Sequence, residues 1–421
     1  MVLSLFRRRR SPRYPGRPPL PMVRRRIPMR YHMRHQFGVR DMAFVQTMYA
    51  LTGSPLAEHN HVQILKNGVR IFPSMLAAIR GAKKTINLEF YIYWDGEIGR
   101  EFAQALAERA RAGVKVNVIL DAVGSAPMSQ DLIDFLHRNG VAMEWYHPLR
   151  WYTLSRVNHR THRKLLIVDG EIGFAGGVGI ADDWLGDADR RDHWRETVVR
   201  VEGPVVTQMQ FAFVDNWVKS RGDLLTGLDY FPKVSPRGDQ LVQVMKSSPS
   251  EGSSAAKLLY VVSIVSATKS IYINSAYFVP DRDTTRALEA AVRRGVDVRV
   301  IVPGEFTDVP IVRHASRFYY GSMLRRGVRI FEYQPTMMHA KTMVVDGIWT
   351  TVGSSNFDDR SFRLNDEVNV NIYDENIAAQ MEQMFFEDLA RSEEISRKRW
   401  LKRPWLERVK ERVAGWLKPQ L

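Results

Sequence analysis

The chain has 421 residues, 45% hydrophobic and 25% charged, which is typical of globular proteins and long enough for two domains. It contains no cysteine, which excludes disulfides, thiolate metal ligands and cysteine nucleophiles. The formal net charge is +15. Residues 1–40 carry +12 and residues 391–421 carry +6, so residues 41–390 carry −3. A nucleic-acid enzyme usually carries its positive charge along the substrate groove, so nucleic acid is disfavoured as a partner.

The first 30 residues are rich in arginine and proline and are expected to be unstructured. They are interpreted either as a segment that attaches to an anionic membrane surface or as a soluble arm. Proline-rich sequence follows Arg7–Arg10, so neither a secretory nor a twin-arginine signal is expected. No stretch reaches the eighteen apolar residues of a membrane span, so we expect a peripheral protein at the cytoplasmic face of the cell membrane.

Strands and helices are predicted to alternate along the chain. Residues 61–80 are predicted to form a strand pair turned at Asn67-Gly68, followed by a helix. Apolar and β-branched runs predict strands at 86–93, 116–120, 271–279 and 298–302. Helical periodicity that stops at a glycine predicts helices at 102–111 and 285–294. This alternation indicates an α/β fold, with a mixed sheet flanked by helices on both faces.

The sequence contains an internal repeat. KKTINLEFYIYWDG and HRKLLIVDGEIGFAGG match TKSIYINSAYFVPD and HAKTMVVDGIWTTVGSS, in the same order and about 180 residues apart. This period is too long for a solenoid and indicates a duplicated domain. The predicted organisation is a basic, partly disordered N-terminal extension (1–60), a first domain (61–225), a second domain (235–388) and a basic amphipathic tail (389–421).

The tail is predicted to contain an amphipathic helix after Pro404. Its apolar residues fall on one helical face: Trp405, Leu406, Val409, Val413, Trp416 and Leu417. A basic amphipathic helix rich in tryptophan suits a membrane interface. The alternative is that the helix packs its apolar face on the body of the protein.

Each half contains the pattern H-x-K-x4-D, and the two copies supply the candidate catalytic residues. These are His162, Lys164, Asp169, His339, Lys341 and Asp346. Because side chains alternate along a strand, each histidine is expected to share a face with its lysine. Each aspartate begins an Asp-Gly pair, a strong hairpin signal, so a structural role is favoured for both aspartates within the motif.

The returning strand of each hairpin is expected to bring small residues next to the histidines. With Asp-Gly as the two central turn residues, Gly177 lies across from His162 and Ser354 across from His339. Asn356 can donate a hydrogen bond to a phosphoryl oxygen, whereas its counterpart in the repeat, Gly179, can do so only through its backbone.

Two glutamates occupy matching places in the repeat, Glu196 and Glu367. A carboxylate beside a histidine fixes its tautomer and supports its charged form. Together with Gly177, Ser354 and Asn356, they complete the candidate substrate-binding set. Four further residues are expected to line the pocket: Tyr277, Phe278, Trp94 and Asp95.

The two H-x-K-x4-D motifs, each followed by a Gly-Gly or Gly-Ser element, resemble the phospholipase D superfamily over roughly residues 60–385. NLEFYIYWDGEIG, EYQPTMMHAK and GSSNFDDRSFRLNDEVN resemble its bacterial cardiolipin synthase branch. The resemblance implies two fused phospholipase D-like domains related by a pseudo-twofold axis, one shared active site and no metal. It also implies that His162 is the nucleophile and His339 the acid/base, although the motifs themselves are too symmetric to fix this order.

Three functions are compatible with these features. The favoured one is a phosphatidyl transferase acting on phosphatidylglycerol or a related phospholipid through a phosphohistidine, at an anionic phospholipid membrane. The second is a phosphodiester hydrolase acting on lipid or, less favoured, on nucleic acid. The third is a membrane-binding protein whose first site has decayed at Gly179, which is disfavoured because both His-Lys pairs are retained.

Overall fold

The computed structural model describes residues 33–148, 159–248 and 255–416, which belong to one compact unit. The strands of the first half are β1 (Ala57–Lys66), β2 (Thr85–Phe90), β3 (Lys115–Asp121), β4 (Ala142–Tyr146), β5 (Leu165–Val168), β6 (Ile172–Gly176) and β7 (Thr197–Glu202). Its helices are α2 (Gly68–Gly81), α3 (Glu97–Arg111), α4 (Gln130–Arg138), the short 3-10 helix η2 (Asp182–Trp184) and α5 (Val206–Arg221).

The second half repeats this set of elements. Its strands are β8 (Gln240–Ser247), β9 (Ser270–Asn274), β10 (Asp297–Pro303), β11 (Arg329–Tyr333), β12 (Thr342–Val345), β13 (Trp349–Gly353) and β14 (Glu367–Tyr373). Its helices are α6 (Ala255–Ser266), α7 (Arg282–Arg293), α8 (Pro310–Arg325), α9 (Asp359–Arg363) and α10 (Glu375–Ala390). Helix α1 (Met42–Thr52) precedes the first half, and β15 (Ser392–Glu394), α11 (Arg397–Leu401) and α12 (Trp405–Trp416) follow the second.

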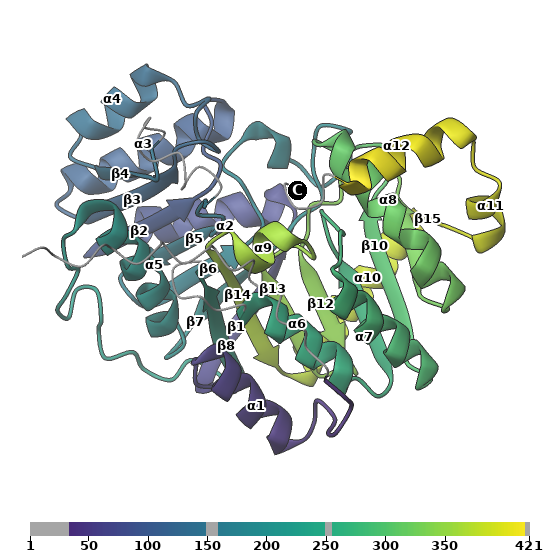
Figure 1. Cartoon of the computed structure of the whole chain (residues 1–421). Coiled ribbons are helices and arrows are strands. Elements are labelled where there is room, and N and C mark those ends of the chain that lie inside the picture. The colour runs from purple at the N-terminus through teal and green to yellow at the C-terminus, as the bar shows by residue number, and fades with distance from the viewer. Residues whose placement is uncertain (1–32, 149–158, 249–254, 417–421) are drawn as a thin grey trace, which may run out of the picture. The chain divides into compact units, whose positions relative to one another are not determined.

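The strands of both halves join into one mixed sheet (Figure 1). Within the described ranges its order is β15-β11-β10-β9-β12-β13-β14-β8-β1-β7-β6-β5-β2-β3-β4. Read outwards from the central antiparallel β8–β1 pair, the two halves follow the same order of equivalent strands, as expected of fused copies related by a twofold axis. The predicted α/β class with two fused, equivalent domains is therefore confirmed.

Helices cover both faces of this sheet because side chains alternate along each strand. In β5, Leu166 and Val168 belong to the core that α2, α3 and α4 cover, whereas Leu165 and Ile167 face α5. Strand β12 divides its side chains in the same way between the α6–α7–α8 side and α10. None of the helices in the described ranges is both long and apolar enough to cross a bilayer.

The strand pair predicted for residues 61–80 is wrong. Strand β1 ends at Lys66 and α2 begins at Gly68, so the Asn-Gly pair joins a strand to a helix. Asn67 has φ 60° and accepts the backbone N–H of Glu196 at 3.0 Å. A Cβ on Gly68 would come 1.9 Å from the carbonyl oxygen of Trp184. The close contact with the backbone of Trp184, rather than a local hairpin, therefore explains why position 68 is a glycine.

The predicted two-residue turns are each one residue too short. Val168 pairs with Ile172, so the loop contains Asp169, Gly170 and Glu171. The second hairpin has the same register, with Val345 paired to Trp349. This register moves the position opposite His162 and the position opposite His339 by one residue each. In addition, β5 and β12 begin after the H-x-K segments, so the histidines precede the strands rather than lie within them.

Residues near the predicted domain boundary at 60 belong to the folded body. Helix α1 buries Phe44 and Met48 in the core of the second half, and the Phe44 ring meets Trp349 edge-on at 6.0 Å. Strand β1 runs through the predicted boundary. The expectation that residues 1–30 are unstructured lies outside the described residues.

Candidate active site

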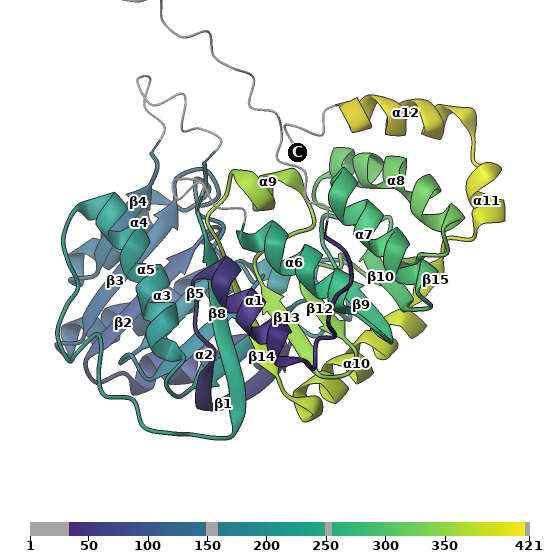
Figure 2. The same ribbon diagram turned by 60° about the horizontal axis from the view of Figure 1, so that its bottom comes forward.

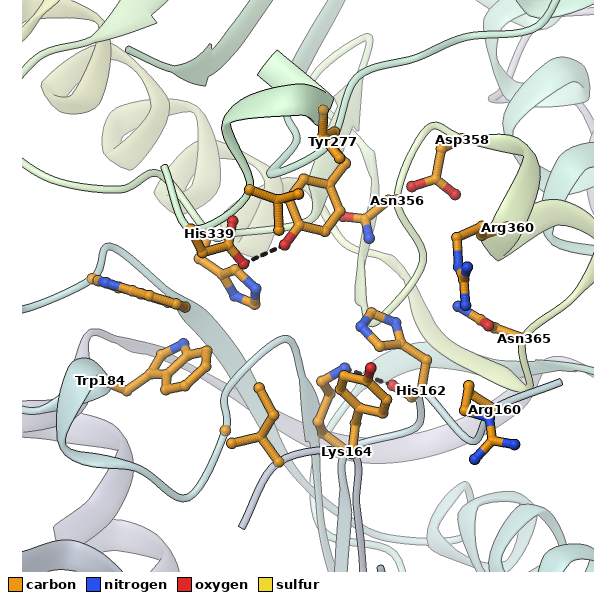
Figure 3. Close-up of a pocket in the computed structure, with 17 residues that line it drawn as sticks. Arg160, His162, Lys164, Trp184, Tyr277, His339, Asn356, Asp358, Arg360 and Asn365 are labelled. Atoms are coloured by element: carbon orange, nitrogen blue, oxygen red, sulfur yellow. Dashed lines mark hydrogen bonds between the residues drawn. The ribbon is translucent and has the colours of Figure 1, made fainter. Parts of the chain in front are cut away.

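The two H-x-K motifs meet in one pocket of about 320 Å³ between the halves of the sheet. His162, Lys164 and His339 line it together with Asn356, and Figure 3 shows the two imidazoles facing each other across the space. Lys341 lies directly behind His339 and is only 1% exposed. The duplicated motifs therefore form one site rather than two.

Backbone hydrogen bonds exchanged between the halves hold the two histidine segments in place. The N–H of His162 donates to the carbonyl of Asp366 at 2.9 Å, and the N–H of His339 donates to the carbonyl of Arg195 at 2.8 Å. Each histidine is thus positioned by the segment that precedes a strand of the other half. Each half therefore contributes a backbone acceptor to the histidine segment of the other half.

The exchange between the halves extends to the side chains, because each histidine is oriented by the glutamate of the other half. His339 Nδ1 lies 2.6 Å from Glu196 Oε2, and His162 Nδ1 lies 3.1 Å from both carboxylate oxygens of Glu367. Both glutamates are fully buried. A carboxylate at Nδ1 places the ring proton there, so the lone pair of Nε2 is the nucleophilic or basic position of each ring. Nε2 of His339 also lies 3.0 Å from Lys341 Nζ.

Burial keeps the imidazoles neutral. It lowers the pKa of His162 to about 4, although the neighbouring Glu367 opposes the shift. Burial, together with Lys341 and Lys164, also holds the pKa of His339 well below its ordinary value. A neutral ring at pH 7 is the form that can attack phosphorus.

The pKa values of the two supporting glutamates are shifted in opposite directions. Burial raises the pKa of Glu196 to about 7, against the attraction of Lys341. Burial also acts to raise the pKa of Glu367, but His162 and Lys164 outweigh it, so the pKa of Glu367 is lowered. The carboxyl behind His162 is therefore the more firmly ionised of the two.

The two lysines bring positive charge to the centre of the site. Lys164 Nζ donates to the carbonyl of His162 at 2.8 Å, and Lys341 Nζ donates to the carbonyl of His339. Burial lowers the pKa of both ammonium groups; that of Lys341 falls to about 8, with Glu196 opposing the shift. At pH 7 the Lys341 ammonium group therefore stays largely protonated, and we expect its charge to offset that of a bound phosphoryl group.

The activity is expected to fall as pH rises above about 8. Because the pKa of Lys341 is lowered, its charged form is complete well below pH 8 and is lost above it. A profile of kcat/KM between pH 6 and 10 should show this alkaline limb, and Lys341→Arg should move it beyond pH 10 because arginine stays protonated. Wild-type activity that keeps rising to pH 10 would contradict this role for Lys341.

Asp169 and Asp346 lie outside the pocket, which corrects their inclusion in the catalytic set. Asp169 accepts the backbone N–H groups of Lys83, Lys84 and Thr85 at 2.9, 2.7 and 2.9 Å. Asp346 accepts the equivalent groups of residues 268–270 at the start of β9. The aspartates therefore fasten each hairpin loop to the neighbouring strand.

Removing one of these carboxylates should lower stability and leave catalysis intact. Asp346→Ala is expected to reduce the free energy of unfolding by about 2–4 kcal/mol, because several hydrogen bonds to a buried carboxylate are lost. Urea unfolding measures this loss, and Asp346→Asn, which keeps one acceptor oxygen, should lose less. An unchanged stability with a large fall in kcat would instead place Asp346 in the chemistry.

The candidate substrate-binding residues separate into two groups. Asn356 faces the pocket, and its Oδ1 has no hydrogen-bond partner within the described part of the chain. Gly177 and Ser354 lie behind the histidines with the two glutamates. A Cβ on Gly177 would come 2.6 Å from Glu196 Oε2, and Ser354 Oγ donates to Glu367. These residues support the histidines rather than face the substrate.

Of the residues expected to line the pocket, Tyr277 does so and its hydroxyl donates to Asp308. Phe278 is buried in the core of the second half. The indole of Trp94 donates to Gly124, and Asp95 pairs with Arg100 on the surface. The expectation is wrong for Phe278, Trp94 and Asp95, because these contacts hold their side chains outside the pocket.

The sequence analysis did not identify four residues that give the two sides of the pocket a different chemistry, with tryptophans beside one histidine and arginines beside the other. Trp184 and Trp194 stand beside the His339 ring, with centroids 5.1 and 5.4 Å away. Arg160 and Arg360 line the side near His162, as Figure 3 shows. Trp184 lies in η2 and Arg360 in α9, the short helices that follow the hairpins of the two halves, so a comparison of these two segments was the available signal.

Comparison with known proteins identifies the family of the chain. Residues 75–217 and 260–389 match the family model described as "Cardiolipin synthase, PLD-like domain". The cardiolipin synthase of Geobacillus kaustophilus (strain HTA426) is 36% identical over 406 residues, covering 96% of this chain and 79% of that protein. The cardiolipin synthase of Listeria monocytogenes serotype 4a (strain HCC23) is 35% identical over 385 residues, covering 91% and 79%.

A solved structure shares the fold. Phosphatidylserine synthase from Haemophilus influenzae Rd KW20 superposes with a TM-score of 0.68 at 14% identity, covering 89% of this chain and 97% of that one. At this identity the likeness concerns the fold alone. On the match of both repeats and on relatives similar over most of its length, the chain belongs to the cardiolipin synthase family of phospholipase D-like proteins.

Proposed function

We propose that this protein is a phosphatidyl transferase that joins the phosphatidyl group of phosphatidylglycerol, or of a related phospholipid, to a lipid alcohol. The observation that carries the proposal is the pair of neutral, buried imidazoles in one pocket, each backed by a glutamate of the other half. Relatives named cardiolipin synthase support this substrate class.

In the proposed first step, His162 Nε2 attacks phosphorus and the bond to the leaving glycerol oxygen breaks. His339 donates the proton that this oxygen takes up, and a phosphohistidine remains on His162. The bound phosphodiester anion favours the imidazolium form of His339, because a nearby negative charge raises the pKa of a base. The cation of Lys341 balances charge on the nonbridging oxygens.

In the second step, the acceptor hydroxyl attacks the phosphohistidine. His339 takes the hydroxyl proton, the phosphorus–nitrogen bond breaks, and His162 returns to its neutral form. Water can resolve the same intermediate, which is why a lipid hydrolase remains the alternative. Transfer is favoured because Trp184 and Trp194 flank His339 and reduce the access of water to the group that activates the acceptor.

The products formed from phosphatidylglycerol vesicles test this proposal. Lipid mass spectrometry is expected to show cardiolipin, with glycerol released in equal amount. EDTA is expected to leave the yield unchanged, because the proposed steps use imidazole and lysine groups. Phosphatidic acid without cardiolipin would indicate the hydrolase, and no turnover would indicate a membrane-binding protein without activity.

We also propose that the enzyme works as a peripheral protein at the cytoplasmic face of the cell membrane. Its positive charge is concentrated at the two ends of the chain, while residues 41–390 carry −3. Such basic ends are attracted to anionic lipid surfaces.

A further inference from the structure

Helix α12 lies on the protein with its apolar stripe turned outward. Its buried side carries Glu411 and Ala414, which are 1% and 3% exposed. The apolar stripe remains in solvent and consists of Trp405, Leu406, Val409 and Val413, which are 70%, 54%, 50% and 56% exposed. A surface helix of a globular protein normally buries such a stripe. Because the stripe is exposed here, the alternative that this helix packs its apolar face on the body is contradicted.

Ion pairs fix this orientation. The buried carboxylate of Glu411 accepts from Arg403 Nε at 2.9 Å and pairs with Arg317 of α8 at 3.4 Å. Arg403 in turn stacks over the ring of Trp400, 3.7 Å from its centroid, and Trp400 is buried against α8. Rolling α12 to bury its apolar stripe would separate Glu411 from both guanidinium groups, which is strongly unfavourable for a buried charge.

Exposed cations are frequent in α12 and in the segment that precedes it. Between residues 397 and 412 the chain has eight basic and two acidic residues, a net charge of +6. The basic residues that are exposed are Arg397, Lys398, Arg399, Lys402, Arg408, Lys410 and Arg412. Apolar side chains can enter the interface of a bilayer, and nearby cations are attracted to its anionic headgroups, so this surface suits an anionic bilayer. A second copy of the chain is a less suitable partner, because its own positive charge would repel the cations of this surface.

The same helix borders the active site through α8. Ala414 shares a buried apolar cluster with Val312 and Ala315 of α8, and Val309 packs against that cluster. Val309 and Val312 also form part of the pocket wall. In Figures 1 and 2, α12 runs along α8 at the edge of the second half. A bilayer that contacts the stripe would therefore lie close to the pocket that holds His162 and His339.

We propose that the exposed face of α12 (Trp405, Leu406, Val409 and Val413) docks into the interface of an anionic phospholipid bilayer beside the pocket. Docking keeps donor and acceptor lipids within reach of the site without moving them through water. This consequence for turnover rests on the proposed transferase function, whereas the docking itself can be measured without catalysis.

Vesicle binding by the full chain tests the docking surface. The variant pair Leu406→Gln/Val409→Gln removes two apolar side chains from the stripe without changing charge. The matched control, Leu224→Gln/Leu228→Gln, changes two leucines that are 71% and 75% exposed in the segment between the halves. Each protein is titrated with vesicles of phosphatidylcholine, with and without phosphatidylglycerol. The α12 pair is expected to weaken binding to the anionic vesicles at least about tenfold, and the control less than about twofold.

Turnover on two forms of substrate separates docking from chemistry. The α12 pair should retain wild-type turnover of a monomeric short-chain phosphatidylglycerol and lose it on vesicles. If the transferase proposal fails, no transfer product is formed from either substrate, yet the difference in vesicle binding still stands. Unchanged vesicle binding by the α12 pair would overturn the docking proposal. A wild-type dimer that the α12 pair dissociates would also overturn it, because the stripe would then be a contact between copies of the chain.

Discussion

His162→Ala is expected to reduce turnover by at least about 10⁴-fold, because it removes the group that forms the covalent intermediate. His339→Ala should be similarly inactive on phosphatidylglycerol, since the leaving glycerol oxygen then receives no proton. Both variants should fold, because the backbone hydrogen bonds of these segments do not involve the rings. Steady-state release of glycerol measures the loss.

A better leaving group distinguishes the roles of the two histidines. With a phosphatidyl ester of p-nitrophenol, the first step needs little acid catalysis, so His339→Ala should still release a burst of p-nitrophenol. His162→Ala should show no burst, and its protein should carry no acid-labile phosphoryl group. A burst in His162→Ala together with its loss in His339→Ala would reverse the assignment of nucleophile and acid.

Replacing either supporting glutamate should also lower kcat strongly, and each replacement should impair the histidine of the other half. Glu196→Gln and Glu367→Gln are each expected to lower kcat about 10²- to 10⁴-fold, because an amide no longer holds the imidazole in the required tautomer. Glu367→Gln should slow the burst of p-nitrophenol, since Glu367 supports His162. Glu196→Gln should spare the burst and slow later turnover, since Glu196 supports His339.

A matched substitution outside the pocket controls for loss of a hydrogen-bonded glutamate. Glu289 accepts a hydrogen bond from Ser322 at 2.6 Å, and Glu289→Gln is expected to leave both phases unchanged. If Glu196→Gln slowed the burst and Glu367→Gln spared it, each glutamate would act on the histidine of its own half. That outcome would contradict the exchange seen in the structure.

The sequence alone determined the features that depend on local pattern and on repetition. The duplicated blocks predicted two α/β halves, and alternation along β5 and β12 explains why helices cover both faces. The H-x-K spacing identified His162, Lys164, His339 and Lys341, which the structure brings to one place. The fold prediction and the proximity of these residues can be read from sequence because side-chain periodicity and repetition are visible over short stretches of chain.

Other boundaries were decided by contacts with distant parts of the chain. Helix α3 begins at Glu97 rather than at residue 102, because the Asp182 carboxylate accepts the N–H groups of Glu97 and Ile98 at its start. The Asn67-Gly68 pair serves a strand–helix junction because Gly68 lies against the backbone of Trp184. Local sequence does not contain these partners.

Only the tertiary structure decided how the two halves share the site. Matching positions made Glu196 and Glu367 candidates, but the repeat is equally compatible with support within one half or between halves. The fold selects the second arrangement, because the segments before β5 and β12 pair with those before β14 and β7. The outward stripe of α12 has a similar origin, since helical periodicity defines an apolar face and the ion pairs of Glu411 decide which way that face points.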